Sequence, residues 1–193
     1  MALMINETIL ALIPARAGSK GINKKNMINV NGLPLIDWTI AAATKSKNIE
    51  KIIISSNDID ISNIAKENNI FFRNRPEEIS KDESLMEEVV NDIISNYSDI
   101  KKYQYLLLLQ PTSPLRTSSH IDNAIKLFRS QDADALISVT HTLEIPQKTM
   151  TIDNDGFLSG LIDNDMPFMS RQLLEATYKP NGAIYIVNID AFK

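Results

Sequence analysis

Short apolar runs alternate with segments of helical periodicity along most of this chain. Runs rich in isoleucine, leucine and valine predict buried strands at residues 8–13, 51–56, 70–72, 103–109, 135–139 and 183–187. Apolar residues spaced by three and four positions predict helices over residues 35–46, 84–97 and 119–128. A further helix is predicted to begin after Asp60, which would cap it. Residues 153–156 separate two further short runs in the manner of a hairpin turn.

The alternation of strands and helices predicts an α/β fold. Its sheet should be mostly parallel and covered by helices on both faces, in a three-layer, Rossmann-like arrangement. Ligands of such sheets bind beyond the carboxyl ends of the strands. The two most unusual polar segments, 15–26 and 110–116, each follow a predicted strand directly. We therefore expect both segments at one edge of the sheet, where a ligand would bind.

The composition narrows the classes of function. The chain has 193 residues, no cysteine and a formal net charge of −4. The lack of cysteine excludes disulfides, thiolate zinc sites and a cysteine nucleophile, and the net charge argues against a general nucleic-acid binder. No apolar run has the length of a transmembrane helix, and the first residues lack a signal-peptide pattern. We expect a cytoplasmic protein that binds neither membrane nor nucleic acid.

Residues 14–21, Pro-Ala-Arg-Ala-Gly-Ser-Lys-Gly, form the first candidate binding segment. The glycines allow the backbone to approach a ligand and to turn its N–H groups inward. Arg16 offers two parallel donors to a phosphate, and Lys20 and Lys25 add point charges. The spacing differs from that of a P-loop or a dinucleotide-binding motif. The segment is a candidate triphosphate cradle, with a solvated surface loop as the alternative.

Two further segments carry polar candidates. Residues 110–116, Gln-Pro-Thr-Ser-Pro-Leu-Arg, form a rigid loop, in which the amide of Gln110 offers donors and an acceptor to a polyhydroxylated ligand. A plain connection between strand and helix is the alternative. Arg171 has the chemistry to pair with a substrate carboxylate, although a surface arginine is the simpler interpretation.

These motifs resemble those of the acylneuraminate cytidylyltransferases, also called CMP-sialic acid synthetases. Four segments in the family's order, spread over nearly the whole chain, carry the resemblance. They are residues 13–21 with Lys25 and Asn26, residues 75–78 with Ser80, Asp82 and Ser84, residues 109–116, and residues 180–185. The resemblance implies an α/β fold of the nucleotide-diphospho-sugar transferase type, usually dimeric. It also implies transfer of CMP from CTP to the anomeric hydroxyl of a nonulosonic acid, with release of pyrophosphate.

The resemblance implies roles for individual residues as well. Those expected to be catalytic are Arg16, Lys20 and Arg171. The nucleotide would be held by Ala15, Arg16, Gly18, Ser19, Lys20, Lys25, Asn26, Arg75 and Ser84, and the sugar acid by Gln110 and Arg171. Ser84 also has capping-box spacing to Glu87, so a helix cap is its alternative role. Magnesium is the implied cofactor, and CTP, the nonulosonic acid and a second copy of the chain are the implied partners.

The sequence departs from the family's pattern at two places. Asn57 stands in Ser-Asn-Asp, where the family more often has Ser-Thr-Asp. The family also continues beyond the final strand, with the aspartates of its magnesium site in that segment. We therefore expect residues 1–193 to form a single cytidylyltransferase domain without that segment, and no metal ligands are predicted.

Alternatives to an N-acylneuraminate substrate stay open. Legionaminic or pseudaminic acid would suit the same motifs, whereas enzymes for the eight-carbon acid of lipopolysaccharide resemble the loop at 110–116 poorly. A different class of function is a CTP-binding domain without catalysis.

Overall fold

The computed structural model describes residues 8–18, 21–131, 133–142 and 144–192. Contacts divide the chain into two compact units, one comprising Met1–Ser138 with Gly182–Lys193 and the other Val139–Asn181. Strands β7 (Ala135–His141) and β10 (Tyr178–Asn188) have residues in both units. The expectation of one cytidylyltransferase domain over residues 1–193 stays a prediction.

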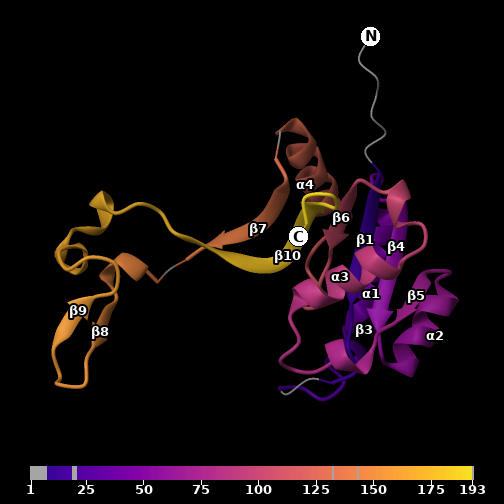
Figure 1. Cartoon of the computed structure of the whole chain (residues 1–193), viewed down its shortest axis with the longest axis horizontal. Coiled ribbons are helices and arrows are strands. Elements are labelled where there is room, and N and C mark those ends of the chain that lie inside the picture. Colours follow the sequence, from indigo (N-terminus) through magenta and orange to yellow (C-terminus); the bar gives the residue numbers. More distant parts are fainter. Residues whose placement is uncertain (1–7, 19–20, 132, 143, 193) are drawn as a thin grey trace, which may run out of the picture. The chain divides into compact units, whose positions relative to one another are not determined.

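A six-stranded sheet with the order β5-β4-β1-β6-β10-β7 forms the centre of the first unit (Figure 1). Besides β7 and β10, its strands are β1 (Ile9–Pro14), β4 (Lys51–Ser56), β5 (Phe71–Asn74) and β6 (Tyr105–Leu108). The pairs β1–β4, β1–β6 and β4–β5 are parallel, whereas β10 runs antiparallel to β6. The predicted mostly parallel sheet is therefore confirmed, with β10 as a reversed strand that the sequence pattern did not indicate.

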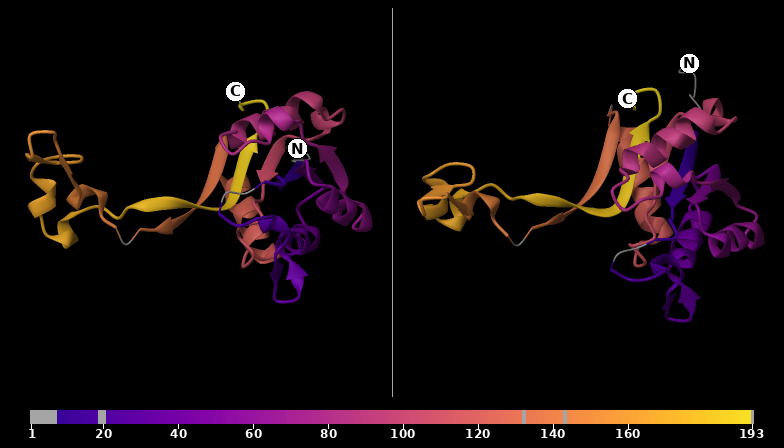
Figure 2. Two further views of the ribbon diagram at one scale, coloured as in Figure 1. Left: turned by 90° about the horizontal axis from the view of Figure 1, so that it is seen from below. Right: turned by 60° about the horizontal axis from the view of Figure 1, so that its bottom comes forward.

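Helices cover both faces of this sheet (Figures 1 and 2). They are α1 (Leu35–Lys45), α2 (Ile59–Glu67), α3 (Met86–Asn96) and α4 (Ser118–Ser130). Ile9, Ala11 and Ile13 of β1 pack with α1, α2 and α4, while Leu10 and Leu12 face α3. Every residue of β1 is buried because both of its faces are covered, which explains its uninterrupted apolar sequence. The three-layer arrangement is confirmed.

Three predicted helix starts are wrong by one or two residues, and one of them is that of α4, which begins at Ser118 rather than at residue 119. The carboxylate of Asp58, rather than that of Asp60, caps α2 by accepting the Asp60 N–H at 2.9 Å. Leu85 precedes α3, and its N–H donates to the Glu88 carboxylate at 2.8 Å. Ser84 is not the cap, because its hydroxyl donates to the Glu78 carbonyl at 3.3 Å.

Short elements complete the first unit. Strands β2 (Asn29–Val30) and β3 (Leu33–Pro34) form a small hairpin. Its turn, Asn31-Gly32, has positive φ angles at both residues, which suits this residue pair. The 3-10 turns of this unit are η1 (Lys25–Met27), η2 (Glu77–Ile79) and η3 (Ile100–Lys102).

The second unit contains a second hairpin. Strands β8 (Met150–Ile152) and β9 (Leu158–Gly160) pair antiparallel around the turn predicted at 153–156. Its other elements are η4 (Pro146–Lys148), η5 (Met166–Phe168) and η6 (Arg171–Leu173). Across the described ranges of both units, the helices are too short or too polar for a membrane span.

Candidate functional site

A polar cavity lies at the carboxyl ends of β1 and β6, which are parallel neighbours in the sheet. The cavity has a volume of about 120 Å³ and takes its walls from both polar segments singled out in the sequence. The lining residues are Pro14, Arg16, Gly18, Lys25, Asn26, Arg75, Met86, Gln110, Pro111 and Thr112. The expectation that the two segments meet at one edge of the sheet is confirmed.

The start of the glycine loop is fixed by hydrogen bonds at three consecutive residues. The Ala15 N–H donates to the Ser55 carbonyl at 2.9 Å, and the Ala17 N–H donates to the side-chain oxygen of Asn57 at 2.9 Å. Between them, the Arg16 carbonyl accepts from the side-chain amide of Asn26 at 3.1 Å. Ser55 belongs to strand β4 and Asn57 follows that strand directly, so the strand next to β1 holds the start of the loop in place. Backbone fixed in this way at residues 15–17 loses little further entropy when a ligand binds.

Arg16 forms an ion pair across the mouth of this loop. Its guanidinium lies 2.6 Å from the carboxylate of Asp82, and both side chains are partly exposed. Asp82 follows the 3-10 turn η2, which is linked to the loop a second time because the Asn57 amide donates to Glu77 at 3.3 Å. An internal carboxylate therefore binds the arginine that was predicted to bind phosphate.

Arg75 supplies a second, buried cation. Only 4% of the residue is exposed, and its guanidinium donates to the hydroxyl and the carbonyl oxygen of Ser55 at 3.1 and 2.8 Å. Burial, with the nearby charge of Arg16, lowers the pKa of Arg75 to about 10, so the residue stays cationic at neutral pH. No carboxylate among the described residues forms an ion pair with it. A buried cation of this kind favours an anionic ligand, which would compensate its charge.

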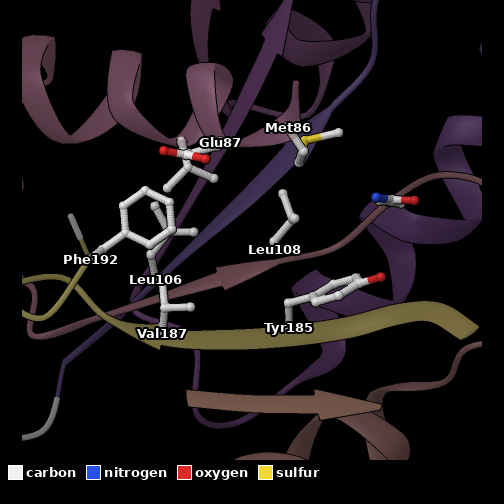
Figure 3. A pocket seen from close by; sticks show the side chains of 9 residues that line it. Met86, Glu87, Leu106, Leu108, Tyr185, Val187 and Phe192 are labelled. Atoms are coloured by element: carbon white, nitrogen blue, oxygen red, sulfur yellow. The ribbon is translucent and has the colours of Figure 1, made fainter. Parts of the chain in front are cut away.

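An apolar cavity of about 380 Å³ adjoins the polar one, and Met86 and Gln110 line both. Figure 3 shows Met86 and Glu87 entering it from α3, opposite the side chains that rise from the sheet. The remaining lining residues are Val90, Leu106, Leu108, Tyr185, Val187 and Phe192. The two cavities together form a concave region that is cationic at one end and apolar at the other.

Six of the predicted site residues line the polar cavity: Arg16, Gly18, Lys25, Asn26, Arg75 and Gln110. Ala15 is buried in the core, with its N–H bonded to β4, and Ser84 does not line the cavity. Ser19 and Lys20 lie outside the described residues. Arg171 belongs to the second unit, where it lines a cavity of about 310 Å³ with His141 and Glu175. The ligand-binding and catalytic roles of all these residues stay predictions.

Three residues of the site region had no role assigned from the sequence: Asn57, Asp82 and Arg116. The first was noted only as a departure from the family's pattern, and the other two only as members of motifs. They contact residues that are distant in the sequence, at separations of 40, 66 and 67 residues for Ala17, Arg16 and Ala183 respectively. No local pattern could have revealed such contacts.

The residues of the polar cavity do not fit a preformed magnesium site. None of its lining residues is a carboxylate, although carboxylates are the usual protein ligands of magnesium. Over the ranges that the structure describes, no group of three or more histidine, aspartate or glutamate residues is arranged to hold a metal ion. The cavity is built to receive negative charge.

Comparisons with known proteins agree with this geometry. A family model described as cytidylyltransferase matches residues 10–186. The chain is 37% identical to an N-acylneuraminate cytidylyltransferase of Escherichia coli, over 93% of this chain and 42% of that protein. It is 33% identical to a CMP-N,N'-diacetyllegionaminic acid synthase of Legionella pneumophila, over 92% of this chain and 77% of that protein.

A solved structure adds evidence on the fold. The CMP:2-keto-3-deoxy-manno-octonic acid synthetase complexed with CTP matches with a TM-score of 0.68 and 14% identity, over 96% of this chain and 76% of that one. At this identity the likeness shows the fold alone. The chain spans less than half the length of the Escherichia coli relative. Because the family model covers residues 10–186, and the Legionella relative is matched over most of its own length, the chain belongs to the cytidylyltransferase family.

Proposed function

We propose that this chain transfers CMP from CTP to the anomeric hydroxyl of a sialic-acid-type nonulosonic acid and releases pyrophosphate. The observation that carries the proposal is the cavity where Arg16, Lys25 and Arg75 converge beside the amide of Gln110. Three cations match the charge of a triphosphate, and the neighbouring amide matches a hydroxylated sugar. The similarity to N-acylneuraminate cytidylyltransferases supports this substrate class.

The chemistry requires charge stabilisation more than acid or base groups. A bond forms between the anomeric oxygen and the α-phosphorus of CTP, the bond from that phosphorus to the α,β-bridging oxygen breaks, and the hydroxyl proton passes to solvent water. Negative charge grows on the departing pyrophosphate. The guanidinium groups of Arg16 and Arg75, with the ammonium of Lys25, stabilise this charge. The loop held by Asn26 and Asn57 positions the phosphates for in-line attack.

The sugar acid is proposed to bind on the side of Gln110, which lines both the polar and the apolar cavity. Arg171 is proposed to pair with its carboxylate. N-acylneuraminate is the first candidate for the acid. Legionaminic acid is the second, since a synthase named for its CMP conjugate is 33% identical to this chain.

Magnesium is proposed as the companion of CTP. Magnesium in phosphate-transfer sites is held largely by substrate phosphates, with only one or two carboxylates and several waters. Such a mode does not require a cluster of protein ligands. A cytoplasmic location is proposed as well, because a chain without cysteine fits a reducing compartment.

A pyrophosphate-release assay tests the proposed function. Wild-type protein is mixed with CTP, MgCl₂ and either N-acetylneuraminate, legionaminic acid or pseudaminic acid. Turnover with one of these acids is expected, and CTP binding without turnover would indicate a non-catalytic nucleotide-binding domain. Replacing Arg16 by Ala should reduce kcat/KM for CTP, whereas Lys24→Ala should not. Lys24 is the matched control because this neighbouring cation pairs with Asp60 at 2.8 Å and does not line the cavity.

A homodimer through the second unit is also proposed. Large apolar side chains in this unit lie open to solvent, with exposed fractions of 72% for Phe157, 80% for Phe168 and 69% for Leu173. Exposed apolar surface of this density is typical of an interface, and a second copy of the chain presents the same surface. Analytical ultracentrifugation of wild type should give a dimer, and Phe168→Ser should weaken it. A wild-type monomer at high protein concentration would contradict the proposal.

A further inference from the structure

Arg116 is a buried cation that the proposed chemistry does not use. Only 5% of the residue is exposed, and burial lowers its pKa to about 10. Within the described part of the chain, no ion pair involves it. Burying a guanidinium without a carboxylate is costly, and its Nε–H also lacks a hydrogen-bond partner. The hydrogen bonds that Arg116 makes must therefore account for its presence in the interior.

The guanidinium of Arg116 joins three elements behind the cavity. One terminal nitrogen donates to the carbonyl of Gln110 at 3.1 Å and to that of Ala183 at 2.6 Å. The other donates to the hydroxyl of Thr39, a buried residue of α1, at 2.8 Å. A planar guanidinium can satisfy acceptors in three directions, which the single nitrogen of a lysine does less well.

These bonds fix the point where β6 and β10 separate. The antiparallel ladder between the two strands extends to the pair of Leu108 and Tyr185, and Gln110 lies beyond it. Arg116 continues the connection by bonding to one carbonyl from each side. At the same place Gly182 has a φ of +74°, and a Cβ added to it would lie 3.4 Å from the side-chain oxygen of Gln110. The Gln110 side chain therefore packs against the backbone that Arg116 holds.

We propose that Arg116 is a positioning residue that sets the orientation of Gln110 between the two cavities. It touches no substrate and acts through the main chain of Gln110 and Ala183. The inference rests on the proposed function, in which Gln110 contacts the sugar acid. It adds an element that determines specificity. The guanidinium of Arg116 holds the loop at Gln110 and the strand at Ala183, which are proposed to face the sugar acid.

Steady-state kinetics of Arg116→Lys test the role. The variant keeps the charge but not the planar set of donors, so KM for the sugar acid should rise about tenfold through the loss of one or two hydrogen bonds. KM for CTP should stay unchanged, because Arg16, Lys25 and Arg75 are not bonded to Arg116. Thermal unfolding of the variant establishes that it is folded. An equal loss for both substrates would indicate general damage and would overturn the proposal.

A double-mutant cycle separates positioning from stability. In a Gln110→Ala background, Arg116→Lys should have no further effect on KM for the sugar acid, since the group through which it acts is already gone. Additive effects would overturn the proposal. Arg129→Lys is the control, because this arginine bonds to Asn48 in the segment after α1 and its replacement should not affect either substrate.

A measurement without turnover keeps this inference distinct from the proposed function. The side-chain amide signals of Gln110, assigned by their loss in Gln110→Ala, should shift or broaden in Arg116→Lys when observed by NMR. Unchanged signals would reject the positioning role even if the enzyme is active. Shifted signals in a protein that turns over no sugar acid would reject the proposed function and leave Arg116 as the residue that orients Gln110.

Discussion

The guanidinium of Arg16 and the carboxylate of Asp82 form an ion pair at 2.6 Å, on the rim of the cavity proposed to receive a triphosphate. The carboxylate occupies a binding position that a phosphate oxygen would also favour. Under the proposed function, CTP would exchange one anionic partner of Arg16 for another, and part of the binding free energy would be spent on that exchange.

Removing the Asp82 charge should tighten CTP binding. A partly exposed ion pair is worth about 0–1 kcal/mol, so Asp82→Asn should lower the Kd for CTP by about two- to fivefold. Isothermal titration calorimetry measures the change. Asp99→Asn, which removes the partner of Lys102 at the opposite ends of the strands, should have no effect. Weaker binding by Asp82→Asn would mean that this carboxylate supports the CTP complex.

Replacing Arg75 by Met should weaken CTP binding without lowering the free energy of unfolding. CTP binding should weaken by roughly a hundredfold, because charge-assisted hydrogen bonds contribute about 1.5–3 kcal/mol each. The free energy of unfolding should be unchanged or higher, since the variant removes a buried cation that has no carboxylate partner. Urea unfolding and calorimetry measure the two quantities. A large loss of stability would show that the bonds to Ser55 outweigh the cost of burial.

The difference in the free energy of unfolding between Arg75→Met and wild type should depend on pH. The pKa of Arg75 in the folded chain is about 10, below its ordinary value. Between pH 10 and that ordinary value the unfolded chain binds more protons at this group, so its contribution to the free energy of unfolding rises with pH. The stability advantage of Arg75→Met over wild type should therefore be full below pH 10 and shrink above it. Urea unfolding at pH 9 and pH 11 provides the check.

Loss of the Asn57 side chain should release the glycine loop. Asn57→Ala removes the acceptor of the Ala17 N–H, and one hydrogen bond is worth about 0.5–1.5 kcal/mol, so CTP should bind about threefold to tenfold more weakly. The matched control is Asn48→Ala, in which an asparagine bonded to Asp122 and Arg129 is lost. It should lower the melting temperature without changing the affinity for CTP. Equal affinities for all three proteins would reject a positioning role for Asn57.

Arg171→Ala should affect the sugar acid far more than CTP. A desolvated carboxylate–arginine pair is worth roughly 2–4 kcal/mol, so KM for the sugar acid should rise at least about thirtyfold. KM for CTP should change little. Steady-state kinetics with each substrate varied in turn provide the measurement, and equal effects on the two constants would contradict carboxylate pairing.

Much of the fold follows from local sequence signals. The uninterrupted apolar run of β1 predicts a strand buried on both faces, and the structure buries each of its residues. Because β1 and β6 are parallel neighbours, the polar segments after them had to meet at one edge of the sheet. The helix starts were less well determined, since Asp58 and Asp60 are both acceptable caps in sequence and only the backbone geometry selects Asp58.

The sequence by itself determined the alternation of strands and helices, the edge of the sheet at which the site forms, and the cationic character of its first loop. These follow from periodicity and residue type, which act over a few positions. Tertiary structure alone decided which cations line the polar cavity. Arg75 and Arg116 both belong to polar motifs and both become buried, yet Arg75 lines the cavity while Arg116 bonds to the backbone behind it. Apart from the Gln110 carbonyl, their acceptors lie on strands and a helix distant in the chain, so only the packing of those elements could distinguish them.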